Sequence, residues 1–123
     1  MSNRIVHFEL HCPDVKASVK FFEDVFGWKF QSWPGPEAYY LATTGDDRKP
    51  GINGGLMPSR DGQPRTVNTL QVESVDAAVS KVIANGGKNV VPKMAIPNVG
   101  WVAYCTDPGR NIFGVYTPDS NAK

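Results

Sequence analysis

The sequence predicts an α+β fold made of two tandem modules, each running strand, helix, strand, strand, strand. Three observations predict it: a pattern repeated sixty positions apart, strands that alternate apolar and polar residues, and a helical apolar stripe in each half. The repeat pairs Leu10, Val15, Ala17, Val19 and Gly27 with Leu70, Val75, Ala77, Val79 and Gly87. A molecule bound between such modules would contact matching positions from both.

The first module is expected over residues 4–57. Strict alternation over residues 4–11 predicts a strand with His7 and Glu9 on one face and apolar side chains on the other. Asp14 is expected to cap a helix, and Gly27 to end it in a left-handed conformation. Three short strands are then expected at 28–32, 38–44 and 52–57, separated by the turn residues 34–36 and 45–51.

The second module is expected over residues 66–117, after a loop at 58–65. It comprises a strand at 66–72, a helix capped by Ser74 and stopped at 85–87, and strands at 88–91, 101–106 and 111–117. Residues 107–111 have the composition of a hairpin turn. Residues 93–99 are interpreted as either a lid or a connection, and 118–123 as a frayed tail. One domain over 4–117 results, in which the strands form a curved, cup-like mixed sheet with the helices outside.

Composition and charge argue against two classes of partner. The chain has 123 residues, 41% of them hydrophobic, and a formal net charge of +1, with no basic cluster suited to nucleic acid. No apolar run approaches the roughly 20 residues that span a bilayer, and no secretory leader is recognised, so we expect a cytoplasmic protein with neither nucleic-acid nor membrane partners. Cys12 and Cys105 are expected to be reduced, buried and structural.

Several motifs, in this order and spacing, are characteristic of one superfamily. They are His7 in the first strand, Phe21-Phe22 through Phe26-Gly27-Trp28-Lys29 at the helix end, the turn 107–111, and the segments 51–56 and 91–97. With them, residues 4–117 resemble the glyoxalase / bleomycin-resistance / extradiol dioxygenase (vicinal-oxygen-chelate) superfamily, in particular a glyoxalase-related subgroup. The resemblance is strong evidence for a fold and weaker evidence for a reaction.

The resemblance implies a metal site that this sequence does not complete. Metal enzymes of the superfamily take one ligand from the first strand and one from the last strand of each module, and these positions fall here on His7, Gly55, Val67 and Gly114. One histidine does not supply the donors that a divalent ion needs, so we expect no cofactor. The alternative is a divalent metal held by His7 with Glu9 and His11 of the same strand.

Strand parity instead predicts a pocket with a few polar groups. His7 and Glu9 are the candidate catalytic residues, because a histidine beside a carboxylate can act as general base or acid near neutral pH. They can equally serve as donor and acceptor for a ligand, or form a structural pair. Gly55 and Gly114 would leave room for that ligand, and His11 is assigned a surface or capping role. The candidate ligand-binding residues are Thr69, Asn53, Met57, Trp101 and Tyr116, with Trp101 as a stacking platform.

Three functional hypotheses follow. The first is a metal-free protein that binds a small organic molecule in the cup, either to sequester a toxic compound or to transform it by acid–base chemistry. The second is a metal-dependent lyase or dioxygenase of the glyoxalase type. The third is an interaction module that kept the fold and lost the site. The sequence leaves open whether the chain is an enzyme, and it is compatible with a homodimer.

Overall fold

A computed structural model describes residues 2–34 and 38–123 and divides the chain into two compact units. The first unit is His7–Val67, and the second is Met1–Val6 with Asn68–Lys123. The division falls within strands β1 (Ile5–Cys12) and β5 (Arg65–Gln71). Residues before β1 belong to the second unit because Asn3 donates a backbone hydrogen bond to Gln71, and Gln71 donates one to Arg4.

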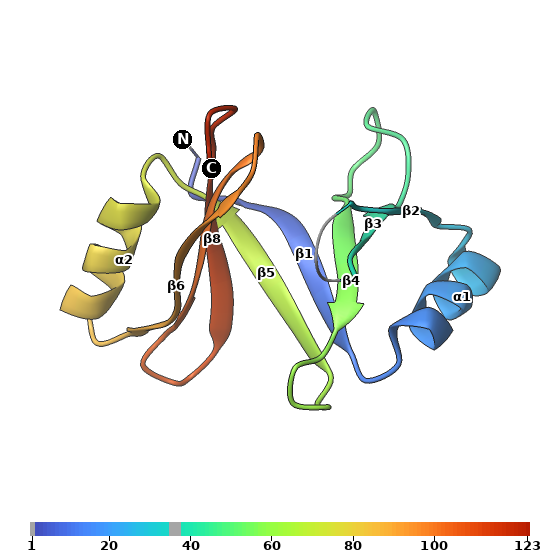
Figure 1. Ribbon diagram of the computed structural model, residues 1–123, viewed down its shortest axis with the longest axis horizontal. Helices are drawn as coiled ribbons and strands as arrows, with labels where there is room; N and C mark the ends of the chain where they lie inside the picture. Colours follow the sequence, from blue (N-terminus) through green and yellow to red (C-terminus); the bar gives the residue numbers. More distant parts are fainter. Residues whose placement is uncertain (1, 35–37) are drawn as a thin grey trace. The chain divides into compact units, whose positions relative to one another are not determined.

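The first unit contains helix α1 (Val15–Phe26) and strands β2 (Lys29–Ser32), β3 (Tyr40–Thr43) and β4 (Gly54–Pro58), together with most of β1 (Figure 1). Its strands lie in the order β2-β3-β4-β1, and β4 runs parallel to β1 while the other pairs are antiparallel. The helix begins and ends as predicted. The Asp14 carboxylate accepts a hydrogen bond from the Ala17 amide, and Gly27 closes the helix at a φ of 72°.

The core of the first unit lies between α1 and one face of these strands. Cys12, Ala42 and Leu56 are its buried centre, and the rings of Phe22 and Trp28 stack on it with their centroids 4.6 Å apart. Since side chains alternate along a strand, burial of Leu10 and Cys12 against α1 places the odd-numbered residues of β1 on the opposite face. His7, Glu9 and His11 therefore share the face that α1 leaves uncovered.

The second unit repeats this plan. It contains helix α2 (Val75–Ala84) and strands β6 (Lys88–Ile96), β7 (Gly100–Thr106) and β8 (Ile112–Pro118), with strand order β5-β8-β7-β6. The β5–β8 pair is parallel, and the Ser74 hydroxyl caps α2 by accepting from the Ala77 amide. The first strand and the helix of each module therefore begin sixty residues apart, as predicted. The buried core side chains of this unit are Val75 at the start of α2 and, from the rest of the unit, Val72, Ala103 and Val115.

Strand β6 is longer than expected. The prediction ended it at Val91 and treated 93–99 as a lid or connection, but β6 runs to Ile96 and pairs with β7 up to Gly100. Of the two prolines that suggested an irregular segment, Pro92 lies within β6 where the β6–β7 register shifts between Asn89 and Met94, and Pro97 follows the last residue of the strand. The side-chain Nδ2 atom of Asn89 stabilises this irregularity by donating hydrogen bonds to the backbone carbonyls of Val91 and Tyr104.

The segment after β8 is also more ordered than predicted. The Asn98 amide donates to the Ala122 carbonyl at 3.0 Å, the Asp119 amide donates to the Val99 carbonyl, and Ala122 is 1% exposed. The expectation of a frayed tail at 118–123 is therefore wrong. The predicted hairpin turn is confirmed, since the amides of Asp107 and Arg110 close it and the Asp107 carboxylate accepts from the Asn111 amide. Of the turn predicted at 34–36, residues 35 and 36 lie outside the described residues.

No helix within residues 2–34 and 38–123 is long and apolar enough to cross a membrane. Both cysteines are free and buried, as expected.

Candidate functional site

Four polar side chains form a connected cluster on the uncovered face of the first unit. His7, Glu9 and His11 come from β1, and Tyr39 comes from the irregular segment just before β3. The Nε2 atom of His7 lies 2.9 Å from the Tyr39 hydroxyl, which donates to Oε2 of Glu9 at 3.1 Å. The Nε2 atom of His11 lies 3.3 Å from Oε1 of the same carboxyl group. Glu9 is thus held from two sides, and it is 8% exposed.

The hydrogen bonds of this cluster converge on Glu9. A tyrosine hydroxyl has one proton, and Tyr39 directs it at Glu9, so its oxygen must accept from an N–H at Nε2 of His7. An ionised carboxylate can only accept, so Nε2 of His11 also carries a proton. A neutral imidazole has a single N–H, which leaves the Nδ1 atom of His7 with a lone pair that can take up a proton.

Burial keeps His7 in this neutral form. Burial lowers the pKa of His7 below its usual value, and the attraction of the nearby Glu9 carboxylate offsets this shift only in part. At neutral pH the imidazole is therefore a base rather than a cation. In the part of the chain that the structure describes, its Nδ1 atom has no protein hydrogen-bond partner. That atom is the one available to a bound molecule.

Gly55 makes the position of Tyr39 achievable. In the parallel β1–β4 pair, Glu9 lies directly beside Gly55, and the Tyr39 hydroxyl lies over this glycine. A Cβ atom added at Gly55 would overlap that hydroxyl and the adjacent ring carbons. The sequence led us to expect open space for a ligand at Gly55, and this expectation is wrong because Tyr39 occupies the space.

The shifted pKa of His7 makes stability dependent on pH. The unfolded imidazole takes up a proton near its usual pKa of about 6.5, while the folded His7 remains neutral until a lower pH. The unfolded state then binds more protons, so we expect the free energy of unfolding to fall as the pH drops through this window. Thermal melts between pH 7.5 and 5 measure the slope, which His7→Gln should reduce. A slope that is equal in wild type and His7→Gln would contradict the assignment, and the exposed Lys29→Gln is the matched control.

The predicted ligand residues of the second unit do not form a comparable polar cluster. Thr69 is 5% exposed and lies beside Gly114, where the space is narrow because a Cβ at Gly114 would come within 3.1 Å of the Thr69 hydroxyl. The Tyr116 hydroxyl donates to the Val99 carbonyl at 3.2 Å, and burial raises the pKa of this phenol. Trp101 packs on the α2 side of its strand, on the face opposite Tyr116, and its indole nitrogen donates to Asp119.

Two predicted ligand residues of the first unit have different surroundings. Asn53 is exposed, and its side-chain oxygen accepts from the backbone amide of Thr44 at 2.9 Å, which closes the loop between β3 and β4. Met57 pairs in register with His11 and is half-buried on the same face as the cluster. His11, which was assigned a surface or capping role, has a side chain that is 17% exposed and lies 3.3 Å from the Glu9 carboxylate.

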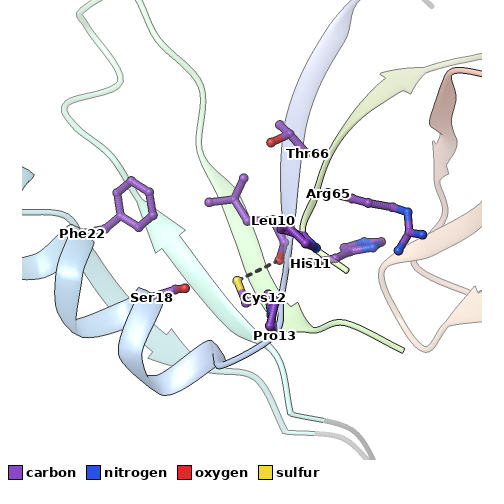
Figure 2. A pocket seen from close by; sticks show the side chains of 9 residues that line it. Leu10, His11, Cys12, Pro13, Ser18, Phe22, Arg65 and Thr66 are labelled. Carbon is purple, nitrogen blue, oxygen red and sulfur yellow. Dashed lines mark hydrogen bonds between the residues drawn. The ribbon is translucent and has the colours of Figure 1, made fainter. Parts of the chain in front are cut away.

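A separate cavity of about 360 Å³ lies at the end of β1 (Figure 2). Ser18 and Phe22 of α1 line one side, while His11 and Arg65 lie on the other side of the strand. The guanidinium group of Arg65 is already paired with the Asp61 carboxylate through both terminal nitrogens. Burial raises the pKa of the Cys12 thiol, which also lines the cavity. Of the cluster residues, His11 alone lines this cavity, so the cavity is distinct from the space around His7.

The residues present do not fit a four-ligand metal centre. Gly55 and Gly114 carry no donor atoms, Val67 is apolar and fully buried, and the Tyr39 hydroxyl covers Gly55. Across the described ranges, no three His, Cys, Asp or Glu side chains are grouped so that they could hold a metal ion.

Sequence reasoning missed Tyr39. It lies outside a regular strand, so alternation does not assign it to a face. The available signal was Gly55, because a glycine inside a strand often marks the close approach of another group. Read in that way, Gly55 predicts a filled position beside Glu9.

Comparison with known protein sequences finds bleomycin-resistance-like and glyoxylase proteins among those similar to this chain. A family model described as bleomycin resistance protein-like N-terminal matches residues 4–45, which include His7, Glu9 and Tyr39. Two curated relatives, from Mycobacterium bovis and Mycobacterium tuberculosis, carry the name "Putative glyoxylase CFP32". Each is 30% identical over 112 residues, which cover 88% of this chain and 43% of the relative. The chain therefore spans less than half the length of the curated relatives it matches.

Solved structures share the fold at low sequence identity. Methylmalonyl-CoA epimerase from Mycobacterium tuberculosis has a TM-score of 0.73 at 12% identity, over 96% of this chain and 89% of the epimerase. A Streptomyces coelicolor methylmalonyl-CoA epimerase variant in complex with 2-nitronate-propionyl-CoA has a TM-score of 0.72 at 13% identity, over 100% of this chain and 99% of the epimerase. The Mn(II)-bound glyoxalase from Novosphingobium aromaticivorans scores 0.68 at 19% identity, over 99% of this chain and 40% of that protein. These likenesses establish the fold alone.

Proposed function

We propose that this chain, which has the vicinal-oxygen-chelate fold and resembles bleomycin-resistance-like and glyoxylase proteins in sequence, binds a small organic molecule against His7, Tyr39 and Glu9. His7 acts on that molecule as a general base through its Nδ1 atom. The observation that carries the proposal is the buried cluster itself, in which a neutral imidazole has one nitrogen bonded and the other unbonded.

The chemistry of this arrangement suits a molecule with a weakly acidic hydrogen. A neutral imidazole can take up a proton from such a molecule and, once protonated, return it. Structural neighbours include epimerases with CoA esters bound and a manganese glyoxalase, and the first of these groups suggests thioesters as probes. Because the residues at this site do not complete a four-ligand metal centre, we propose a reaction that needs no metal ion.

Sequestration without a reaction is the second candidate. The match to the bleomycin-resistance-like N-terminal family covers the whole cluster, and a polar cluster can orient a ligand without transferring a proton. The two candidates share the binding site and differ only in whether a proton leaves the bound molecule. Loss of a carbon-bound proton signal from a bound probe in D₂O separates them, because only a base that acts on the probe exchanges that proton.

A ligand screen by thermal shift tests the proposal. The probes are methylmalonyl-CoA, a hemithioacetal of an oxo-aldehyde with glutathione, catechol and bleomycin, each added to wild type, His7→Gln and Lys29→Gln. A ligand at 100 times its Kd stabilises the folded state by about 2.7 kcal/mol, so binding is readily detected. We expect at least one probe to raise the melting temperature of wild type and Lys29→Gln but not that of His7→Gln.

Two results would contradict the proposal. In the first, every probe that stabilises wild type also stabilises His7→Gln to the same degree, which would place binding elsewhere. In the second, no probe stabilises wild type, which would reject these four chemical classes as ligands. Lys29 is exposed on the edge strand β2, so its substitution controls for the general effect of placing a glutamine in a strand of this unit.

A further inference from the structure

We infer that Tyr39 is a positioning residue that connects His7 to Glu9, so that when Nδ1 of His7 takes up a proton, the Nε2 proton passes to the Tyr39 oxygen and the Tyr39 proton passes to Glu9. The inference rests on the proposed function, because it requires His7 to be the base. It adds a residue that sequence reasoning did not select and assigns Glu9 a role separate from ligand contact.

The directions of the hydrogen bonds support this transfer. Nε2–H of His7 points to the Tyr39 oxygen over 2.9 Å, and the Tyr39 O–H points to Oε2 of Glu9 over 3.1 Å. Both distances are within the range of ordinary hydrogen bonds, and both donors are oriented toward the carboxylate. When a proton binds to Nδ1 of His7, one proton can therefore shift along each of the two hydrogen bonds toward Glu9. No side chain has to change its hydrogen-bond partner for this to happen.

The transfer balances in three steps. The C–H or O–H bond of the bound molecule breaks, its proton forms a bond to Nδ1 of His7, and the electron pair stays on the molecule. The Nε2–H bond of His7 breaks as its proton bonds to the Tyr39 oxygen, and the Tyr39 proton passes to Oε2 of Glu9. The products are a neutral His7 with its proton on Nδ1, a neutral Tyr39 and a neutral Glu9. The negative charge has moved from Glu9 to the bound molecule.

Two features of the fold hold this arrangement. Gly55 leaves the space that the Tyr39 hydroxyl fills directly beside Glu9, where any Cβ atom would overlap it. His11 donates to Oε1 of Glu9 at 3.3 Å, which orients the carboxylate so that Oε2 faces Tyr39. Among the described residues, the titratable side chains linked to His7 through these hydrogen bonds are Tyr39 ahead of β3, Glu9 of β1 and, through Glu9, His11 of β1.

Nitrogen NMR of the histidine rings tests the inference in the resting protein. The chain contains two histidines, and His11→Gln leaves the signals of His7 alone for assignment. We expect wild-type His7 to carry its proton on Nε2 at pH 7. As the pH is lowered toward 4, we expect the neutral ring to change to the Nδ1–H tautomer while Glu9 becomes protonated, before any imidazolium forms. Direct conversion to imidazolium with Glu9 still ionised would overturn the inference.

Variants distinguish loss of the hydrogen-bonded link from His7 through Tyr39 to Glu9 from a general change in the fold. Tyr39→Phe removes the hydroxyl, and Gly55→Ala displaces it while keeping all four polar side chains. In both we expect mixed His7 tautomers at pH 7 and direct imidazolium formation on acidification. Gly45→Ala is the matched control, because nothing lies within 4 Å of a Cβ at that position. A Tyr39→Phe protein that keeps the wild-type tautomer and titration would overturn the inference, as would a Gly45→Ala protein with the same changes as Gly55→Ala.

Failure of this inference differs from failure of the proposed function. If His7→Gln abolishes probe binding while Tyr39→Phe leaves the His7 titration unchanged, the ligand site stands and the connection to Glu9 is wrong. If the tautomer changes as expected but probes bind His7→Gln normally, the hydrogen-bonded chain exists and its functional role is rejected.

Discussion

Replacing Gly54 by alanine is expected to lower the free energy of unfolding by about 3 kcal/mol, at the upper end of the usual cost of overpacking. Gly54 lies in the parallel β1–β4 pair directly beside Phe8 and is also paired with Ala42 of β3. A Cβ at this position would overlap the backbone carbonyl oxygen and the ring of Phe8. Because the ring can rotate but the carbonyl belongs to the strand ladder, β1 and β4 must separate.

Chemical denaturation monitored by circular dichroism measures this effect. Gly45→Ala serves as the control, since its added methyl group meets nothing within 4 Å and should leave the midpoint nearly unchanged. The displacement of β1 should also alter the ring signals of His7, one residue before Phe8. Equal midpoints for Gly54→Ala and Gly45→Ala would show that the two strands are not as closely paired as described.

Leu56→Ala is expected to cost about 2–5 kcal/mol of unfolding free energy. Leu56 is 0% exposed and is the largest side chain in the buried centre of the first unit, where it packs with Cys12 and Ala42 under α1. Its removal loses buried apolar surface and leaves a cavity that neighbouring aromatic rings fill only in part. The cluster on the opposite face of the strands contributes nothing to this loss.

The same denaturation experiment checks this expectation, with Val25→Ala as the comparison. Val25 is 55% exposed on the outer side of α1, so its truncation should cost only a few tenths of a kcal/mol. A Leu56→Ala protein as stable as Val25→Ala would mean that the space between α1 and β4 is not a packed core. Loss of probe binding without loss of stability would place Leu56 in the ligand site instead.

Local chemistry explains why most of the fold was predictable. Asp14 and Ser74 cap their helices, Gly27 ends α1, and alternation along β1 assigns His7 and Glu9 to one face. These signals act within a few residues of one another. The length of β6 was not predictable in this way, because the prolines indicate a break and only the register shifts against β7 show how the strand continues.

The candidate site was predicted in part. His7 and Glu9 follow from the period of a single strand, but Tyr39 depends on a hydrogen bond between a loop residue and Glu9 of β1, which lie thirty residues apart in the sequence. No local pattern encodes that contact. Gly55 was noticed and interpreted as room for a ligand, because the sequence cannot tell an empty space from one filled by the chain itself. The face of β7 on which Trp101 lies was uncertain for a similar reason, since only the pairing of β7 with β8 assigns its side chain to the α2 side.

The metal content of the chain, purified without chelator and measured by elemental analysis, distinguishes a base at His7 from a metal ligand at His7. We expect no stoichiometric divalent ion in wild type, and unchanged ion content in His7→Gln. One ion per chain that disappears in His7→Gln would contradict this expectation, because the Nδ1 atom of His7 would then be a metal ligand rather than a base for a bound organic molecule.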